Sequence, residues 1–224
     1  MPRICVFDVN ETLLDLSALD PHFERAFGDA AVRQAWFTQL LQSAFVSTIT
    51  GDYKDFGTIG STALEMVAAR RGATLSPEDR SSILGGMRHL PPHPDVREGL
   101  ERLRRAGVRL VTLTNSTEEV GQAQISNAGL GEYFEHLFSA DTARRLKPAQ
   151  EPYRMVAERL GVGIGELRLV AAHAWDIAGA LHAGCVAAFV ARPAMVLDPL
   201  FEPPDVVGAD LREVAERILE REHG

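Results

Sequence analysis

The chain has 224 residues, of which 46% are hydrophobic and 24% are charged, and its formal net charge is −8. This composition is ordinary for a globular protein, and the sequence contains neither a signal-peptide pattern nor an apolar stretch near the roughly 18 residues that a membrane span needs. The negative charge and the lack of a basic stripe interleaved with aromatic residues argue against nucleic acid as a partner. We therefore expect a cytoplasmic protein that binds neither membranes nor nucleic acid.

Four apolar runs along the chain are typical of strands buried in a parallel sheet. They occupy residues 3–8, 108–114, 167–172 and 185–191. Helical patterns separate the last three runs, at residues 118–128, 150–160 and 176–183. A further short strand is expected within residues 131–140, and residues 198–220 are expected to form a loop, an edge strand and a closing helix. Because strands alternate with helices, we predict a doubly wound α/β sheet with a ligand site at the carboxyl ends of its strands.

Residues 15–94 lack a clear strand and carry the apolar periodicity of helices in three stretches, at residues 32–48, 57–72 and 76–87. We predict that they form a helical cap inserted into an α/β core made of residues 1–14 and 95–224. Asp15 is expected to cap the start of the insertion. The chain returns to the core through the proline-rich stretch "LPPHPDV" at residues 90–96, which suits a hinge. A cap of this kind excludes water from a site at the sheet edge.

Polar side chains follow the predicted strands at the edge where a ligand site is expected. They are Asp8 after the first strand, Thr114 and Asn115 after the second, Lys147 in a later loop, and His173 and Asp176 after the strand at residues 167–172. Because the carboxyl ends of neighbouring parallel strands share one edge, we expect these residues to meet in the folded chain.

Four motifs resemble those of the haloacid dehalogenase (HAD) superfamily of aspartate-nucleophile hydrolases, and within it the type II L-2-haloacid dehalogenases. They are "FDVNETLLD" at residues 7–15, "LTNST" at 113–117, "RLKPAQEPY" at 145–153 and "AAHAWDIAGA" at 171–180. The resemblance implies a HAD-like Rossmannoid core and an enzyme whose Asp8 attacks carbon or phosphorus to form an ester that water then cleaves. It also implies that Lys147 pairs with Asp8, keeps it ionised and offsets an anionic substrate.

The same resemblance places further residues of these motifs in the substrate-binding set, namely Asn10, Thr12, Thr114, Asn115 and Tyr153. The Thr114 hydroxyl and nearby backbone N–H groups would hold a substrate carboxylate or phosphate at a helix N-terminus. Plain helix caps have the same sequence pattern as Thr114 and Asn115, so that alternative stays open. A position in the core is the alternative for Tyr153.

Asn10 stands where phosphatases of this superfamily carry a second aspartate, which protonates the leaving alkoxide and then activates water. An amide cannot donate that proton, whereas a halide is a weak base and needs no acid. Asn10 therefore favours carbon–halogen cleavage, although dehalogenases typically carry an aromatic residue here. Ala172 stands where one of two Mg²⁺-binding acids is usual, the other being Asp176. We expect an enzyme without a cofactor, and the alternative is Mg²⁺ held by Asp8 and Asp176.

Other positions, besides Asn10, also depart from the dehalogenase pattern. Phe37, also placed in the substrate-binding set, stands where those enzymes carry an arginine, and Arg33 one helical turn earlier is a candidate replacement. His173 replaces an asparagine and is expected beside Asp176, where it would bind halide as a cation or deprotonate the hydrolytic water. A structural role is the alternative for His173. Glu11 replaces a small residue, and its side chain is expected to point away from Asp8 without a catalytic role.

Together these patterns predict a hydrolase that cleaves carbon–halogen bonds of small, anionic 2-halo acids through an aspartyl ester. Water activated near Asp176 or His173 would then hydrolyse this ester, which places both residues with Asp8 and Lys147 in the catalytic set. A Mg²⁺-dependent phosphatase of a small phosphorylated metabolite is the alternative in another reaction class, and a non-catalytic binding module with the same fold is the third. The apolar stretch "AWFTQLLQSAFV" at residues 35–46 is expected to expose a patch too large for a monomer. Because the dehalogenases that the chain resembles are commonly dimers, we predict a homodimer.

Overall fold

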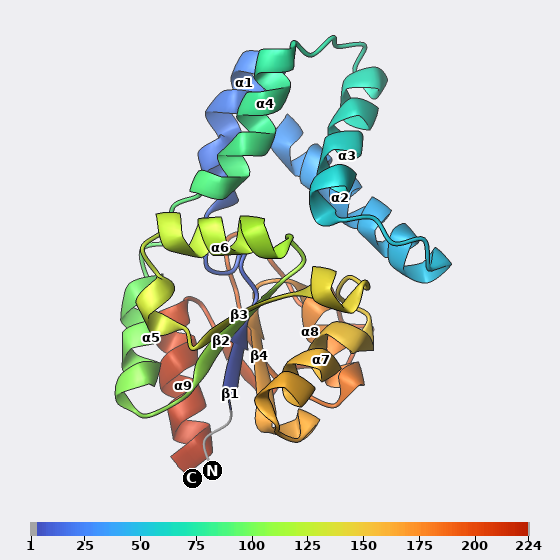
Figure 1. Cartoon of the computed structure of the whole chain (residues 1–224). Coiled ribbons are helices and arrows are strands. Elements are labelled where there is room, and N and C mark those ends of the chain that lie inside the picture. Colours follow the sequence, from blue (N-terminus) through green and yellow to red (C-terminus); the bar gives the residue numbers. More distant parts are fainter. Residues whose placement is uncertain (1–3, 224) are drawn as a thin grey trace.

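The structure, a computed structural model, describes residues 4–223 and contains one sheet of six strands with helices around it (Figure 1). All five strand pairs are parallel, and the spatial order is β3-β2-β1-β4-β5-β6. In that order the strands are His136–Ser139, Leu110–Thr114, Ile4–Phe7, Leu167–Ala171, Val186–Val190 and Val206–Gly208. The predicted doubly wound α/β fold is confirmed. Arg3, the first residue of the predicted first strand, lies outside the described residues.

The central strand β1 shows why these short apolar runs form strands. All four of its residues are buried, and successive side chains point to opposite faces of the sheet. Cys5 and Phe7 belong to one hydrophobic cluster, whereas Ile4 and Val6 belong to another on the opposite face. A run without polar alternation is therefore what a strand covered on both faces requires.

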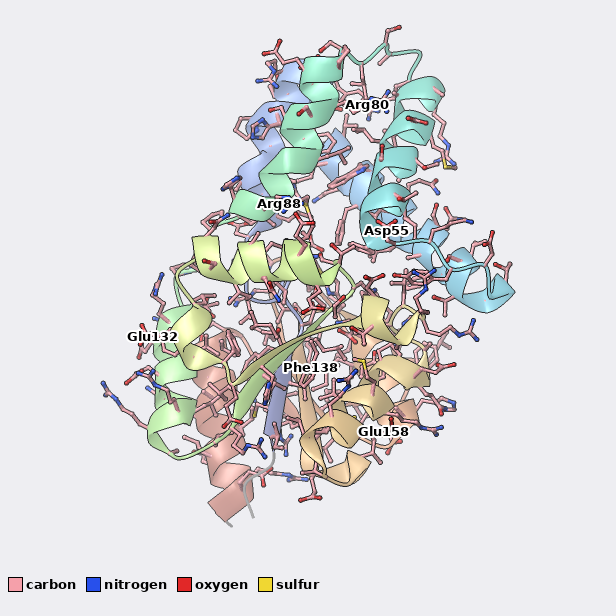
Figure 2. All side chains as sticks on the ribbon, viewed as in Figure 1. Asp55, Arg80, Arg88, Glu132, Phe138 and Glu158 are labelled. Atoms are coloured by element: carbon pink, nitrogen blue, oxygen red, sulfur yellow. The ribbon has the colours of Figure 1, made fainter. Side chains whose placement is uncertain are left out.

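Helices cover the two faces of this sheet (Figure 1). The helices α5 (Val96–Arg105) and α9 (Leu211–His223) pack together on the face that holds Phe7, through residues such as Leu100 and Ile218. The helices α7 (Gln150–Leu160) and α8 (Ala174–Ala183) cover the other face, and α6 (Glu118–Asn127) lies near the carboxyl edge of the sheet. Figure 2 shows side chains filling the space between sheet and helices, with the exposed Glu132 and Glu158 at the periphery.

Four helices follow β1 and lie beyond the carboxyl edge of the sheet (Figure 1). They are α1 (Asp20–Phe27), α2 (Val32–Thr50), α3 (Phe56–Arg70) and α4 (Pro77–Gly86). The sequence predicted the last three. The helix α1 was missed because its eight residues, which bury the side chain of Phe23 alone, are fewer than the stretch over which an apolar repeat can be recognised. The short 3-10 helices are Leu16–Leu19, Met87–His89, Gly131–Tyr133, Ala140–Ala143 and Ile164–Glu166.

The chain enters and leaves this helical segment at one place, directly beside the end of β1. Leu14 and Pro92 form an antiparallel bridge, and the Asp15 N–H donates to the carbonyl of Pro91 at 2.8 Å. The Asp15 carboxylate accepts from the Ser17 N–H at 2.9 Å, so it caps the first turn, as the sequence predicted. Both ends of the segment are thereby fixed close to Asp8.

The long helix α2 buries four of the eight apolar residues in the stretch at residues 35–46. Trp36, Phe37, Leu40 and Ala44 are buried, and Val46 is exposed. The buried residues pack within the helical segment and toward the sheet edge, so the part of the stretch near Val46 is what stays available at the surface. Within residues 4–223, no helix is long and apolar enough to cross a membrane.

Candidate active site

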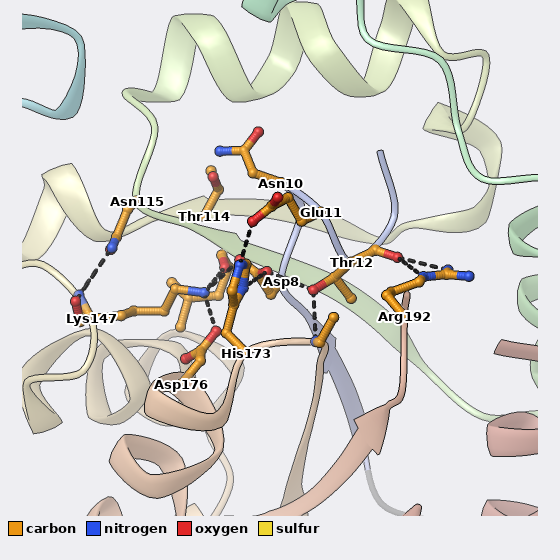
Figure 3. Close-up of polar contacts among 12 residues, drawn as sticks. Asp8, Asn10, Glu11, Thr12, Thr114, Asn115, Lys147, His173, Asp176 and Arg192 are labelled. Atoms are coloured by element: carbon orange, nitrogen blue, oxygen red, sulfur yellow. Dashed lines mark hydrogen bonds and ion pairs between the residues drawn. The ribbon is translucent and has the colours of Figure 1, made fainter. Parts of the chain in front are cut away.

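Asp8 lies one residue beyond β1, where its carboxylate meets the other polar residues that follow the strands (Figure 3). Its N–H donates to the carbonyl of Val170 on β4 at 3.1 Å, which fixes the backbone at the sheet edge. The Lys147 ammonium donates to Asp8 Oδ1 at 2.9 Å and to Asp176 Oδ2 at 2.6 Å. The structure thus joins residues far apart in the sequence, and all three side chains are buried.

The charges in this group stabilise one another. Although burial opposes the charged form, Asp176 and Asp8 raise the pKa of Lys147, so the ammonium keeps its proton. Although burial again opposes the charged form, Lys147 and hydrogen bonds from His173 and Thr12 hold the pKa of Asp8 well below its ordinary value. Asp8 is therefore an ionised carboxylate at neutral pH, which is the form that acts as a nucleophile.

Asp176 occupies the first turn of α8 and faces away from open space. The Tyr153 hydroxyl donates to Asp176 Oδ1 at 2.5 Å, while Oδ2 accepts from Lys147. Burial raises the pKa of Asp176, an effect that Lys147 opposes. Gly179, three residues later, lets α8 approach α7, because a Cβ there would lie 2.8 Å from the Tyr153 hydroxyl oxygen. Tyr153 therefore acts on Asp176 from a core position.

The residues at the end of β2, Thr114 and Asn115, contact other parts of the site framework. The Asn115 side chain brackets the backbone of Lys147, since its Oδ1 accepts from the Lys147 N–H at 2.8 Å and its amide donates to the Lys147 carbonyl at 3.3 Å. The Thr114 hydroxyl accepts from the Ser116 N–H at 3.1 Å. Both side chains are buried, and these contacts hold the lysine loop against the end of β2.

Thr12 supports the second oxygen of Asp8. Its hydroxyl donates to Asp8 Oδ2 at 2.7 Å and accepts from the Ala172 N–H at 2.9 Å. The Thr12 carbonyl in turn accepts from Arg192 at 2.8 Å, and Arg192 pairs with buried Asp95 at 2.7 Å. Sequence reasoning missed Arg192 and Asp95, although Arg192 follows β5 at the same carboxyl edge that predicted the other residues.

His173 lies between two carboxylates and not beside Asp176. Its Nδ1 is 3.2 Å from Asp8 Oδ2, and its Nε2 is 2.9 Å from Glu11 Oε2. The prediction of a pair with Asp176 is wrong because His173 has an extended backbone before α8, whereas Asp176 is turned toward Lys147 within the helix. Glu11, given no role by the sequence, reaches the site through His173. Its backbone is left-handed, with φ at 61°, a conformation that glycine adopts most readily.

The contacts of His173 determine its protonation. An ionised carboxylate only accepts hydrogen bonds, so a ring nitrogen that contacts one carries a proton. Although burial opposes the charged form, the hydrogen bonds to Asp8 and Glu11 raise the pKa of His173 to about 9. The ring is also packed between aromatic side chains, with its centroid 5.1 Å from that of Trp175 and 6.2 Å from that of Phe37. His173 is therefore an imidazolium in a fixed orientation.

A cavity of about 780 Å³ opens beside His173. Its wall includes Glu11 and His173, and also Phe37 and Arg33 of α2 and Trp175 of α8. His173 connects Asp8 to this cavity, because its ring contacts the Asp8 carboxylate and also forms part of the cavity wall. Arg33 lies 3.8 Å from Glu11 Oε1 and also pairs with Asp20, so its charge is shared between two acids. Phe37, at the position expected to hold an arginine, contributes an aromatic wall.

Asn10 lies on the other side of the first motif. Its amide donates to the Ser116 hydroxyl at 3.3 Å, and its Oδ1 accepts from Gln124 of α6 at 2.8 Å. Gln124 is fully buried and also donates to the carbonyl of Met87 at 2.8 Å. Asn10 therefore links the loop after β1 to α6 and to the end of the helical segment. Nothing in its sequence pattern predicted this contact.

The donor groups around Asp8 do not suit a divalent cation. Mg²⁺ requires several oxygen ligands with free lone pairs. Here Oδ1 of Asp8 faces the Lys147 ammonium, and Oδ2 faces Thr12 and the His173 imidazolium. Both oxygens of Asp176 likewise accept hydrogen bonds, Oδ2 from Lys147 and Oδ1 from Tyr153. Positive and hydrogen-bond-donating groups thus occupy the directions from which a cation would bind these two acids.

The fold and the sequence place the chain in one family. The family model for haloacid dehalogenase-like hydrolases matches residues 2–184. The chain belongs to this hydrolase family, as its motifs predicted.

Within that family its relatives include 2-haloacid dehalogenases. The (S)-2-haloacid dehalogenase of Xanthobacter autotrophicus is 31% identical over 198 residues, which are 86% of this chain and 76% of the relative. (S)-2-haloacid dehalogenase 2 of Pseudomonas sp. (strain CBS-3) is 29% identical over 95% of this chain and 93% of the relative. The structure of the Xanthobacter autotrophicus L-2-haloacid dehalogenase with chloropropionic acid covalently bound has a TM-score of 0.91 and 26% identity, over 100% of both chains.

Proposed function

We propose that this hydrolase cleaves the carbon–halogen bond of small, anionic 2-halo acids through an ester on Asp8. The observation that carries the proposal is the ionised Asp8 carboxylate, held by Lys147 on one side and in contact with a cavity-lining residue on the other. The similarity to a dehalogenase with chloropropionic acid covalently bound supports the same reaction class.

In the first step an oxygen of Asp8 attacks the carbon that carries the halogen. The new carbon–oxygen bond forms as the carbon–halogen bond breaks, and the electron pair of that bond leaves with the halide. Lys147 keeps Asp8 ionised before the attack. Asn10 supplies no proton, which suits a halide because it is a weak base and leaves without one. In the second step water hydrolyses the aspartyl ester and restores Asp8.

The supporting residues act mainly by fixing Asp8 and Lys147. Thr12 orients Asp8, Asn115 holds the Lys147 backbone, and Tyr153 holds Asp176. Thr114 lies at the N-terminal side of α6, where backbone N–H groups can receive a substrate carboxylate. Phe37 forms part of the cavity wall, and Asn10 holds the loop after β1 through Ser116 and Gln124. The chemistry requires no metal, because Asp8 and Asp176 already face an ammonium.

We also propose that residues 15–94 act as a cap over a core formed by residues 1–14 and 95–224. The support is the fixed entry and exit of the helical segment beside β1 and the position of Phe37 and Arg33 in the cavity wall. A homodimer is the proposed assembly. Val46 and Ile49 near the end of α2 are exposed by 54% and 84%, so they are available to a second copy. Light scattering at the mass of one 24.5 kDa chain contradicts the dimer.

The decisive experiment is a screen of 2-halo acids and small phosphate esters that measures released halide and phosphate, with and without EDTA. We expect halide release that EDTA leaves intact. Single turnover in ¹⁸O water should place one ¹⁸O atom in Asp8, which mass spectrometry of the active-site peptide detects. Phosphate release that depends on Mg²⁺, or halide release without label in Asp8, overturns the proposal.

A further inference from the structure

The imidazole ring of His173 bridges Asp8 and Glu11 (Figure 3). The same ring forms part of the cavity wall. We propose that His173 is the general base for hydrolysis of the ester on Asp8, and that Glu11 is a positioning residue that fixes the ring for this step. The inference rests on the proposed aspartyl ester. It gives a role to Glu11, which replaces a small residue of the first motif.

Glu11 fixes the tautomer of His173. A carboxylate at Nε2 keeps a proton on that nitrogen and leaves Nδ1 as the atom that gains or loses one. Nδ1 is the nitrogen that faces Asp8, at 3.2 Å from Oδ2. The basic atom is therefore directed at the carboxyl group whose ester must be hydrolysed.

Alkylation of Asp8 changes the state of His173. In the resting enzyme the negative charge of Asp8 holds the Nδ1 proton, whereas an Asp8 ester is neutral and no longer does so. The imidazolium then releases this proton to solvent in the adjoining cavity. The first step of the reaction thus converts His173 from a cation into a neutral base.

The hydrolytic step is balanced in protons and bonds. Nδ1 takes a proton from water as the water oxygen bonds to the carbonyl carbon of the ester. The resulting tetrahedral oxyanion collapses, the bond between that carbon and the ester oxygen breaks, and the product alkoxide takes the proton of the new carboxyl group. Asp8 is again a carboxylate beside an imidazolium. The proton that His173 released earlier is the one proton that hydrolytic dehalogenation yields.

Asp176 is less suited to act as this base. Both of its oxygens accept short hydrogen bonds, one from Lys147 and one from Tyr153, and its side chain is fully buried. The oxygen atoms that would take a proton from water therefore already face Lys147 and Tyr153, and Asp176 is not among the residues that line the cavity. His173, by contrast, combines contact with Asp8 and access to that space.

The backbone at Glu11 supports a functional reason for the side chain. A residue other than glycine at a φ of 61° is held in a conformation that costs free energy. The Glu11 carboxylate that this conformation places in the site is oriented by two charged side chains. His173 contacts its Oε2, and Arg33 lies 3.8 Å from its Oε1. A strained position with two charged partners at the catalytic edge fits a positioning role.

The test is Glu11→Gln in the full chain, with matched single-turnover measurements of halide release and of the Asp8 adduct. We expect alkylation close to the wild-type rate and hydrolysis slowed by about 10²-fold, because the amide no longer fixes the required tautomer. Mass spectrometry should then show the ester on Asp8 accumulating. His173→Gln should accumulate the same adduct. Asp15→Asn removes another carboxylate of the cavity wall while keeping a capping side chain, and should not change the ratio of the two rates.

The pH dependence of ester hydrolysis distinguishes a positioning role of Glu11 from a purely structural one. Hydrolysis of the wild-type adduct should rise with pH as His173 loses its proton, and Glu11→Gln should move the inflection to lower pH because a neutral amide does not stabilise the imidazolium. Wild-type hydrolysis rates in Glu11→Gln, or slow hydrolysis with an unmoved inflection, overturn the inference. Absence of an Asp8 adduct in every variant instead overturns the proposed function itself.

Discussion

The two sides of the Asp8 carboxylate are built differently. On one side, Lys147, Tyr153 and Asp176 form a sealed group in which each polar atom has a partner within the core. On the other side, His173 and Glu11 border a cavity and are joined to Asp8 by a single ring nitrogen. The sealed side keeps the nucleophile charged, and the open side can exchange protons with solvent. In the proposed mechanism, the two sides therefore separate activation of Asp8 from its regeneration.

The strongest test of this comparison removes the residue that both sides share. Asp8→Asn should lower turnover by at least about 10³-fold, because an amide is a far weaker nucleophile than a carboxylate. Steady-state halide release measures the effect, with mass spectrometry of the purified variant to exclude deamidation. Full activity in an undeamidated sample means that Asp8 is not the nucleophile.

The sealed side should contribute to the stability of the fold as well as to the reaction. Lys147→Met leaves Asp8 and Asp176 buried without the ammonium between them, so we expect the free energy of unfolding to fall by about 3–5 kcal/mol. Urea denaturation measures this change. Lys54→Met is the matched control, since Lys54 is exposed with its partner Asp52 and should change stability by less than about 0.5 kcal/mol.

A second substitution shows whether charge is the cause. Adding Asp176→Asn to Lys147→Met removes one of the two unpaired acids and should recover part of the lost stability. If the double variant is as unstable as the sum of the single variants, the loss comes from packing around the lysine stem and not from unpaired charge.

The open side should control how stability responds to pH. The contacts of His173 with Asp8 and Glu11 raise its pKa from an ordinary 6.5 to about 9. The folded protein therefore keeps a proton that the unfolded chain releases first. The stabilisation is complete below pH 6.5 and is lost as the pH rises to about 9. Lys147, which contacts Asp8, stays charged throughout this range because its neighbours Asp176 and Asp8 raise its pKa.

Urea denaturation at several pH values compares the wild type with His173→Asn. The free energy of unfolding of the wild type should fall between pH 6.5 and about 9, and the variant should show a flatter profile in that interval. Parallel profiles for the two proteins contradict a protonated His173 between two carboxylates.

The sequence predicted the sealed side better than the open side, for a physical reason. Asp8, Lys147 and Asp176 follow or adjoin parallel strands, and strand topology alone brings such residues to one edge. The same logic predicted the α/β sheet, because continuous apolar runs such as residues 4–7 need burial on both faces.

The open side depends on side-chain direction, which strand topology leaves undetermined. His173 and Asp176 are three residues apart, yet one has an extended backbone before α8 and the other lies within the helix. Their side chains therefore reach different partners. Glu11 was set aside because a large residue replaced a small one, whereas its left-handed backbone turns the carboxylate to His173. The helix α1 was missed because its eight residues are fewer than the stretch over which an apolar repeat can be recognised.

The smallest expected effect is a stability difference that separates the contribution of the Glu11 backbone conformation from that of its carboxylate. Glu11→Gly and Glu11→Ala both remove the contact with His173, so both should accumulate the Asp8 ester. They differ in backbone freedom, because alanine at a φ of 61° retains the strain that glycine relieves. We expect Glu11→Gly to be the more stable variant by roughly 1 kcal/mol in urea denaturation.

The same pair of substitutions at Glu24 provides the control. Glu24 lies inside α1, where glycine is less stable than alanine by about 1 kcal/mol, so the order of the two variants should reverse. Opposite signs at the two positions, together with slow ester hydrolysis in both Glu11 variants, show that the strained turn is retained for the carboxylate it presents. If Glu11→Ala is as stable as Glu11→Gly, the left-handed turn carries no strain, and the orientation of His173 remains the sole support for a functional Glu11.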